Sequence, residues 1–252
     1  MNQNNDITLK AINKSYQKGD NTVVVHNDFN LTIKSGEFVA LMGPSGLGKS
    51  TLLHLMGGLD KPTHGEVIIG QQRIDNLSQK QLTQWRAENI GFVFQSHHLL
   101  PVLTAQDNVE LPLALTSLNK AQRKQHAKIA LQLVNMSERA HHYPKELSGG
   151  QEQRVAIARA IVSDPQILLC DEPTGNLDRK TADEILALLA RLNSDSGKTI
   201  VMVTHDNKAT EYATRVIDLE SYIMAENTVL AQNIEHSNDK SPLHDNLIGA
   251  KL

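Results

Sequence analysis

The sequence predicts an α/β fold, in which helices wrap a parallel β-sheet, antiparallel strands precede that sheet and a helical subdomain is inserted into it. Three features predict this class. Short runs rich in β-branched residues alternate with longer helical patterns, as in a parallel sheet. A glycine-rich turn joins an apolar run to a helical pattern near residue 43. A chain of 252 residues, 40% of them hydrophobic, is long enough for a main core with a second lobe.

The strands are expected at the apolar runs. Two early runs, residues 7–12 and 23–33, are expected to pair as antiparallel strands. The run over residues 37–43 is a strand that enters the glycine-rich turn, and the helix that begins near Lys49 ends at Gly57-Gly58. Buried strands of the parallel sheet are expected at residues 90–94, 166–171, 199–205 and 215–219.

Helices are expected in most of the remaining chain. The segment of about 95–163 is almost entirely helical in pattern and predicts the inserted subdomain, with helices at residues 103–115, about 120–135 and 151–163. A further helix over residues 178–192 presents leucines for core packing. We therefore expect one domain over residues 1–232, followed by a flexible polar tail at 233–252.

Composition and charge exclude several classes of protein. The 25 basic and 28 acidic residues give a net charge of −3, which does not favour non-specific binding to nucleic acid. The single cysteine, Cys170, can form neither an internal disulfide nor a cysteine-rich zinc site. The first residues lack the features of a secretory signal, and no run of about 18 apolar residues is present. We therefore expect a soluble protein in a reducing compartment, with no nucleic acid as a partner.

The strongest motif is the glycine-rich turn, which fits the pattern G-x-x-x-x-G-K-[ST]. Glycines let backbone N–H groups encircle phosphate oxygens, and the N-terminus of the following helix adds partial positive charge. In this pattern Lys49 reaches the β- and γ-phosphates, and the Ser50 hydroxyl ligates Mg²⁺. An ordinary strand-to-helix turn is the alternative, but strand, turn, Lys-Ser pair and helix all agree. The expected phosphate-binding residues are Gly43, Pro44, Ser45, Gly46, Leu47, Gly48, Lys49, Ser50 and Thr51.

Two adjacent carboxylates, Asp171 and Glu172, end the apolar run at residues 166–171. The end of a buried parallel strand is where such a sheet binds ligands, so Asp171 is expected to hold Mg²⁺ directly or through water. Side chains alternate along a strand, so Glu172 is expected to point elsewhere, toward a water in line with the γ-phosphate, as the general base. Solvated carboxylates at a strand end are the alternative explanation.

A second glycine-containing helix start, Ser148-Gly149-Gly150-Gln151, precedes an amphipathic helical pattern. Its N–H groups form a second anion site in the same chain. Two phosphate-binding helix ends so far apart in sequence are not easily brought to the same nucleotide within one chain. The economical arrangement is a head-to-tail dimer, in which this helix start of one copy closes over a nucleotide held by the other.

Taken in order, GPSGLGKS, LSGGQ and ILLCDEP resemble the nucleotide-binding subunits of ATP-binding cassette (ABC) transporters, and the resemblance covers roughly residues 7–230. It implies a P-loop NTPase core of the RecA type, ATP and Mg²⁺ as cofactors, and ATP hydrolysis coupled to transport. Four more residues match the family. Gln95 matches the catalytic-loop glutamine that senses Mg²⁺ and the membrane partner, and His205 matches the switch histidine at the γ-phosphate. Asp178 matches the dimer-crossing loop, and Tyr16 matches the aromatic residue that stacks on adenine.

Within this family, GEFVALMGPSG, IGFVFQ, LTAQDNVELPL and DEPTGNLD look like the branch that contains the MacB, LolD and FtsE ATPases. This resemblance implies a homodimer, peripheral on the cytoplasmic side of the inner membrane, that drives a separate integral-membrane permease in lipoprotein release or efflux. An ATP-dependent switch that signals to a membrane partner without transport is the alternative function. A DNA-repair relative is disfavoured, because residues 51–147 leave no room for a long coiled coil between the two motifs.

Several residues depart from the family pattern or stand outside it. Glu152 stands where glutamine is common, and it brings a negative charge near the second anion site. Leu47 replaces a small polar residue in the phosphate loop, where its backbone can still bind phosphate. Cys170 is expected to be a small buried hydrophobe. The histidines other than His205 show no metal-ligand spacing, so they are expected at the surface.

Overall fold

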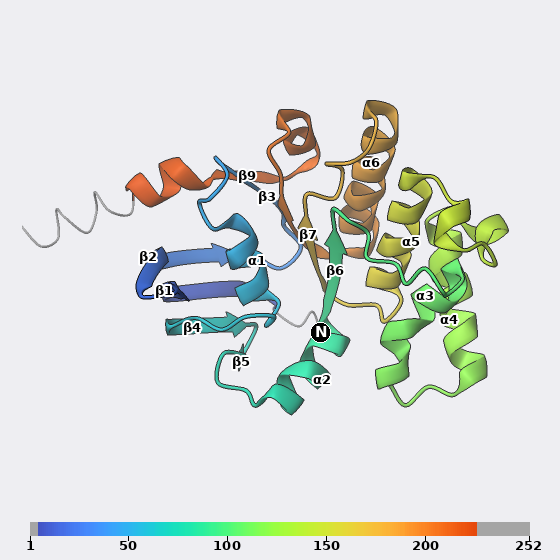
Figure 1. The fold of residues 1–252 in the computed structure, drawn as a ribbon, viewed down its shortest axis with the longest axis horizontal. Coiled ribbons are helices and arrows are strands. Elements are labelled where there is room, and N and C mark those ends of the chain that lie inside the picture. Colours follow the sequence, from blue (N-terminus) through green and yellow to red (C-terminus); the bar gives the residue numbers. More distant parts are fainter. Residues whose placement is uncertain (1–4, 226–252) are drawn as a thin grey trace, which may run out of the picture.

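The structure, a computed structural model, describes residues 5–225 and contains two β-sheets with helices around them (Figure 1). The larger sheet has the strand order β6-β7-β8-β3-β9, and every pairing in it is parallel. Its strands are β3 (Phe38–Met42), β6 (Ile90–Phe94), β7 (Ile167–Asp171), β8 (Thr199–Val203) and β9 (Arg215–Asp218). These bounds agree with the predicted runs, and the predicted α/β fold is confirmed.

A second sheet is antiparallel and has the order β2-β1-β4-β5. Its strands are β1 (Ile7–Lys18), β2 (Asn21–Ile33), β4 (His64–Ile69) and β5 (Gln72–Arg73). The predicted antiparallel pairing of the first two strands is confirmed, and both strands are longer than predicted. Irregular register in this pair accompanies positive φ angles at Ala11 and Asp28.

The helices divide between the faces of the parallel sheet. The α-helices are α1 (Lys49–Met56), α2 (Gln79–Asn89), α3 (Ala105–Glu110), α4 (Lys120–Leu133), α5 (Gly149–Ile161) and α6 (Arg179–Ser196). The 3₁₀ helices are η1 (Leu111–Leu115), η2 (Ser137–Arg139), η3 (Pro144–Glu146) and η4 (Asn207–Tyr212). The predicted helix over 103–115 is split into α3 and η1, because Pro112 has no N–H to continue an α-helix. Residues 219–225 are also helical.

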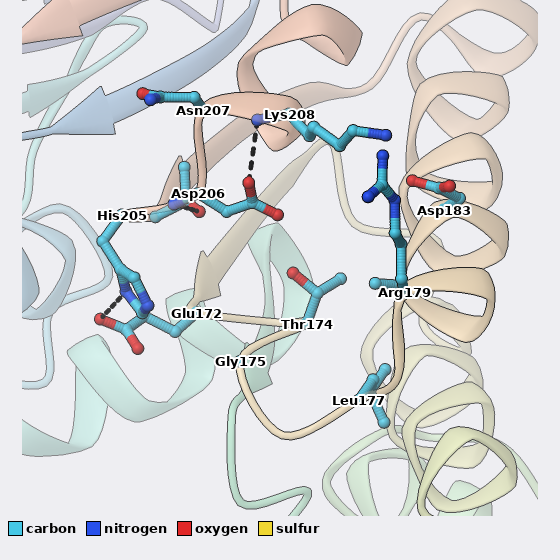
Figure 2. Close-up of a pocket in the computed structure, with 12 residues that line it drawn as sticks. Glu172, Thr174, Gly175, Leu177, Arg179, Asp183, His205, Asp206, Asn207 and Lys208 are labelled. Atoms are coloured by element: carbon cyan, nitrogen blue, oxygen red, sulfur yellow. Dashed lines mark hydrogen bonds and ion pairs between the residues drawn. The ribbon is translucent and has the colours of Figure 1, made fainter.

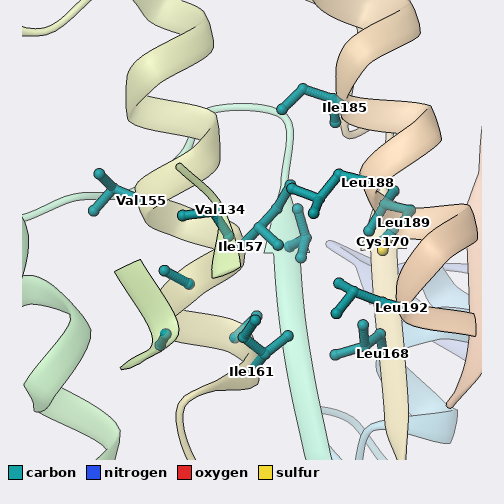
Figure 3. Packing of buried hydrophobic residues seen from close by; sticks show 14 of the residues in the cluster. Val134, Val155, Ile157, Ile161, Leu168, Cys170, Ile185, Leu188, Leu189 and Leu192 are labelled. Carbon is teal, nitrogen blue, oxygen red and sulfur yellow. The ribbon is translucent and has the colours of Figure 1, made fainter. Parts of the chain in front are cut away.

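Strands β3, β7 and β8 of the parallel sheet are buried on both faces, because their side chains alternate between two cores. On β3, Val39 and Leu41 pack with α1 and the antiparallel sheet. Phe38 and Ala40 point the other way, into the core formed with α3 to α6. Figure 3 shows part of this second core, where Ile157 of α5, Cys170 of β7 and Leu189 of α6 lie in one apolar cluster. Cys170 lies fully buried there, as predicted.

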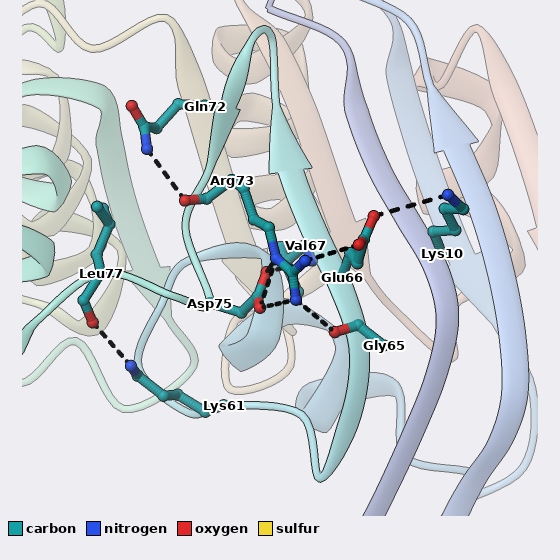
Figure 4. Close-up of polar contacts among 9 residues, drawn as sticks. All are labelled: Lys10, Lys61, Gly65, Glu66, Val67, Gln72, Arg73, Asp75 and Leu77. Carbon is teal, nitrogen blue, oxygen red and sulfur yellow. Dashed lines mark hydrogen bonds and ion pairs between the residues drawn. The ribbon is translucent and has the colours of Figure 1, made fainter.

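The elements β4, β5 and α2 were not predicted from the sequence. Helix α2 buries only Leu82, and a capping box of Ser78 and Gln81 marks its start, so its sequence carries little apolar signal. The two-residue strand β5 is held by charge (Figure 4). Arg73 donates from Nε and Nη2 to Oδ2 of Asp75 at 3.0 and 2.8 Å and from Nη1 to Oε1 of Glu66 at 2.6 Å. Polar contacts therefore shape this edge of the antiparallel sheet.

Two expectations concern the membrane and the tail. Within residues 5–225, no helix is both long and apolar enough to cross a lipid bilayer. The predicted flexible tail at residues 233–252 lies outside the described residues.

Close approach of α5 to β6 gives a prediction about stability. A Cβ atom on Gly91 would collide with the carbonyl oxygen of Ala160 and would lie 2.7 Å from Cδ2 of Leu168. Gly91→Ala should therefore lower the free energy of unfolding by about 1–3 kcal/mol, measured by urea denaturation. Gly149→Ala is the control for stability, because the nearest atom to its Cβ would be Cδ2 of Leu177 at 3.7 Å. Equal stability of the two variants would contradict the packing argument.

Candidate functional site

The predicted phosphate loop lies between the carboxyl end of β3 and the N-terminus of α1. Gly48 is the N-cap residue of α1 and has a φ of 77°, and a Cβ there would collide with Val25 and His26 of β2. Backbone conformation and close packing both require glycine at this position. No side chain among the described residues caps α1, so the N–H groups of its first turn are available to an anion.

Lys49 and Ser50 follow the loop in the first turn of α1. Lys49 is 8% exposed, and its Nζ donates to the carbonyl oxygens of Gly43 and Pro44 at 2.7 and 2.8 Å. The ammonium group therefore lies against the loop that is expected to hold phosphate. The Ser50 hydroxyl donates to Oδ1 of Asp171 over 3.1 Å, which joins α1 to the end of β7.

Ser50 and Asp171 form an oxygen-donor pair that suits Mg²⁺. Burial raises the pKa of the Asp171 carboxyl above its usual range, although the Ser50 hydrogen bond acts in the opposite direction. Among the described residues, no three His, Cys, Asp or Glu side chains cluster as a metal cage. Mg²⁺ needs no such cage, since it is bound through one or two protein oxygens together with phosphate oxygens and water. The pair fits an ion that arrives with a nucleotide.

Glu172 and Asp171 contact different partners, and Glu172 contacts His205. Its Oε1 lies 3.2 Å from Nδ1 of His205, which follows β8 (Figure 2). Its φ of 46° is unusual for a residue other than glycine, and its N–H donates to the carbonyl oxygen of Val203 at 3.0 Å. Strain of this kind is found where the surrounding structure holds a functional side chain in one direction.

Glu172 and His205 border a cavity of about 600 Å³ (Figure 2). Arg179 and Asp183 of α6 and Lys208 of η4 line another part of it. The remaining lining residues are Thr174, Gly175, Leu177, Ala182, Thr204, Asp206 and Asn207. The cavity leaves the carboxylate and the imidazole accessible, and the side chain of His205 is 68% exposed.

Gln95 lies at the end of β6, beside the loop that follows Glu172. Its Nε2 donates to Oδ1 of Asn176 at 3.1 Å, and its side chain packs on Gly175. Within the described residues we find no bond from Gln95 to Ser50 or Asp171. The structure therefore ties Gln95 to the loop after the two carboxylates, and its role as a metal ligand and catalytic residue stays a prediction.

The second helix start, at α5, is open to solvent. Ser148 accepts a hydrogen bond from the N–H of Gln151, and Oε1 of Gln151 accepts one from the N–H of Ser148. Ser148 and Gly149 are exposed, and Gly150 and Gln151 are partly exposed. α1 and α5 pack into different cores, on opposite faces of the parallel sheet. The helix start is thus accessible to a second molecule, as the dimer hypothesis requires.

Asp178 is the N-cap residue of α6, where it accepts hydrogen bonds from the N–H and the hydroxyl of Thr181 at 3.1 and 2.6 Å. These bonds hold the pKa of the Asp178 carboxyl below its usual value. A capping role is therefore visible in the structure, and a role between subunits stays a prediction. Tyr16 is 41% exposed on β1, and its hydroxyl donates to Asp60 at 2.7 Å.

His26, which was expected at the surface, is buried, so the expectation was wrong for this residue, and His97 is half-buried. His26 is 3% exposed, and its Nε2 lies 3.1 Å from the carbonyl oxygen of Gly48, directly behind the phosphate loop. The side chain of His97 is 12% exposed, and its Nδ1 lies 3.2 Å from Oε2 of Glu152. The polar residue in the run VVVHNDF was the available signal for His26. The carboxylate of Glu152, which the sequence places near the second anion site, thus contacts His97 of the same chain.

Comparisons with known proteins show which family the chain resembles. The family model described as ABC transporter matches residues 26–175. The ABC transporter ATP-binding protein MJ0796 of Methanocaldococcus jannaschii is 48% identical over 218 residues, 85% of this chain and 93% of that protein. The lipoprotein-releasing system ATP-binding protein LolD of Idiomarina loihiensis is 45% identical over 218 residues, 86% of this chain and 96% of that protein. The macrolide export ATP-binding/permease protein MacB of Escherichia coli is 46% identical over 213 residues, 84% of this chain and 33% of that protein.

A solved structure is similar as well. It is a dimeric structure of MJ0796 in a post-hydrolysis state, bound to ADP and Pi. It matches with a TM-score of 0.78 and 45% sequence identity, over 84% of this chain and 93% of that chain.

The buried His26 predicts a pH dependence of stability. Burial lowers the pKa of the His26 imidazole, so below about pH 6.5 the unfolded chain binds a proton that the folded chain resists. The free energy of unfolding should therefore fall as pH decreases from 7.5 to 5.5, by about 1 kcal/mol from this residue. Urea denaturation of His26→Leu should show a smaller fall than wild type, and a variant of the exposed His141 should keep the wild-type fall. An unchanged pH dependence in His26→Leu would count against this assignment.

Proposed function

Because the chain belongs to the ABC transporter family, we propose that it is the ATP-hydrolysing subunit of a transport complex, in which two copies close around two ATP molecules and drive a separate membrane permease. The observation that carries this proposal is the meeting of Lys49, the Ser50–Asp171 pair and the Glu172–His205 pair at one edge of the parallel sheet. These groups are the parts that phosphoryl transfer to water requires.

Each residue has a distinct task in this mechanism. The backbone N–H groups of residues 43–51 and the Lys49 ammonium bind the β- and γ-phosphate oxygens. Ser50 and Asp171 would hold Mg²⁺, which supplies positive charge at the phosphate oxygens. Glu172 accepts the proton of the attacking water, and His205, 3.2 Å from it, orients the carboxylate and contacts the γ-phosphate. Gln95 links this region to the neighbouring loop through Asn176.

The accessible start of α5 supports a dimer. Ser148, Gly149 and Gly150 of one subunit reach the γ-phosphate of ATP held by the other, because a helix N-terminus attracts an anion. Asp178, the N-cap residue of α6, is also exposed, and we assign it to the surface that contacts the partner subunit. The known dimer of MJ0796, bound to ADP and Pi, supports the same arrangement for this chain.

A groove of about 220 Å³ between α2, β6, η1 and α5 supports a membrane partner. Phe92, Phe94 and Leu115 give it an apolar wall, and its lining includes Arg86 and Arg159 but no carboxylate. Burial lowers the pKa of Arg159, whose guanidinium donates to the carbonyl oxygens of residues 97 and 98, just after Gln95. An apolar permease segment with an acidic residue fits this groove. Arg159 connects the groove to the ATP site, because it bonds to the backbone just after Gln95.

A permease partner also indicates where the subunit is located and what its complex transports. The subunit lies on the cytoplasmic side of the inner membrane, bound to its permease, and its ATP cycle drives lipoprotein release or efflux. The names of the relatives LolD and MacB support these two substrate classes.

The dimer mechanism predicts the behaviour of Glu172→Gln. Without the general base, ATP hydrolysis should fall by about 10²-fold or more, and the intact triphosphate should hold the two subunits together. Gel filtration in ATP and Mg²⁺ should show the variant as a dimer, and a phosphate-release assay should show its loss of turnover. Glu138→Gln, an exposed site in η2, is the control. A Glu172→Gln protein that stays monomeric in ATP would refute the closed dimer.

The groove predicts the effect of Leu115→Lys. A third cation beside Arg86 and Arg159 should reduce recovery of the permease with the tagged subunit from mild detergent by about tenfold, since apolar contact and charge complementarity are both lost. Leu115 is 56% exposed, so the melting temperature should not change. Leu133→Lys is the matched control, because Leu133 is 55% exposed on α4 and lies outside the groove. Equal recovery with both variants would place the permease elsewhere.

A further inference from the structure

The ring of Tyr16 is held at its hydroxyl and on one of its faces. The hydroxyl donates to Oδ2 of Asp60 at 2.7 Å. The ammonium group of Lys14 lies over the ring, 4.5 Å from its centroid. Tyr16 is nevertheless 41% exposed. A planar group can therefore reach the ring only from the side that Lys14 leaves open.

Lys14 is itself fixed in place. It is 8% exposed, and its Nζ donates to Oδ1 of Asp60 and to the carbonyl oxygen of Lys61, both at 2.8 Å. A buried ammonium group with a carboxylate at this distance has little freedom to leave the ring, because separating the pair would leave a charge uncompensated. The position of Lys14 above Tyr16 is thus set by Asp60.

Asp60 connects this cluster to the phosphate-binding helix. It follows α1, and its N–H donates to the carbonyl oxygen of His54 in that helix. Its Oδ1 also accepts from the N–H of Lys61 at 2.7 Å. One carboxylate therefore holds a strand residue and its aromatic neighbour at a fixed place relative to α1, although Tyr16 and Asp60 are 44 residues apart in sequence.

We propose that Lys14 and Asp60 are positioning residues for the nucleotide base: they hold the Tyr16 ring so that its open face stacks on adenine. This inference rests on the proposed binding of ATP at the phosphate loop and on the match of Tyr16 to the adenine-stacking residue of the family. A base stacks well only on a ring whose plane is already set, since ordering a mobile side chain on binding costs free energy. Lys14 and Asp60 remove that cost without touching the nucleotide.

The test compares ATP with inorganic tripolyphosphate, which has the phosphates but no base. Dissociation constants for both, in Mg²⁺, are measured by titration calorimetry on the full chain. Tyr16→Ala should weaken ATP by about tenfold, the typical loss of one stacked base. Tyr16→Phe, Asp60→Asn and Lys14→Met should each weaken ATP by about three- to tenfold. Tripolyphosphate affinity should stay within about twofold in every variant, because the phosphate loop is intact.

Matched controls come from the neighbouring ion pair of Lys10 and Glu66. This pair joins β1 to β4, the strand that follows Asp60 in the chain, at 3.7 Å. Lys10→Met and Glu66→Gln should leave both affinities unchanged. Tyr16→Phe removes only a hydroxyl, so it tests the proposal even where a substitution of the buried Lys14 unfolds the chain.

Three results would overturn the proposal. If Tyr16→Ala weakens ATP and the other three variants do not, stacking stands but Lys14 and Asp60 do not position the ring. If ATP and tripolyphosphate weaken equally, the cluster supports the phosphate loop and not the base. If Tyr16→Ala itself leaves ATP affinity unchanged, the stacking of adenine on Tyr16 that the family resemblance implies fails as well, while ATP binding at the phosphate loop stands.

Discussion

The parallel register of β7, β8 and β3 is the constraint on which the site depends. Asp171 is level with Val203, and Val203 is level with Leu41, so the three strands end at nearly the same height. The phosphate loop, the two carboxylates and His205 all begin at these ends, which lie at one edge of the sheet. Burial of both sheet faces holds this register, because a slip of one residue would turn the side chains of a strand from one core into the other.

The two glycine-containing helix starts have different surroundings, and the difference matches their proposed tasks. At α1, no side chain among residues 5–225 caps the helix, and Lys49 adds a cation, so the start is suited to hold most of a triphosphate. At α5, Ser148 and Gln151 cap each other, and Glu152 contacts His97. That start is rigid and exposed, as expected of a surface that closes on a ligand held elsewhere.

Contacts with the antiparallel sheet extend the site beyond the phosphates. His26 of β2 packs behind Gly48, and Asp60 connects Tyr16 of β1 to the end of α1. The hairpin of β1 and β2 therefore lies against both ends of the same short helix. Tyr16 and the phosphate loop belong to different sheets, yet polar contacts through Asp60 and His26 join them and limit how far one can move against the other.

The strands of the parallel sheet, the phosphate loop, the two carboxylates and the α5 start could be predicted from the sequence alone, because each depends on residues close together in the chain and on a regular apolar period. Only the tertiary structure brought Ser50 to Asp171, Glu172 to His205 and Gln95 to Asn176. It also decided the burial of His26 and the formation of α2, whose sequence is mostly polar. The physical reason is that these features depend on packing and hydrogen bonding between segments distant in sequence, and no local pattern encodes which distant groups will meet.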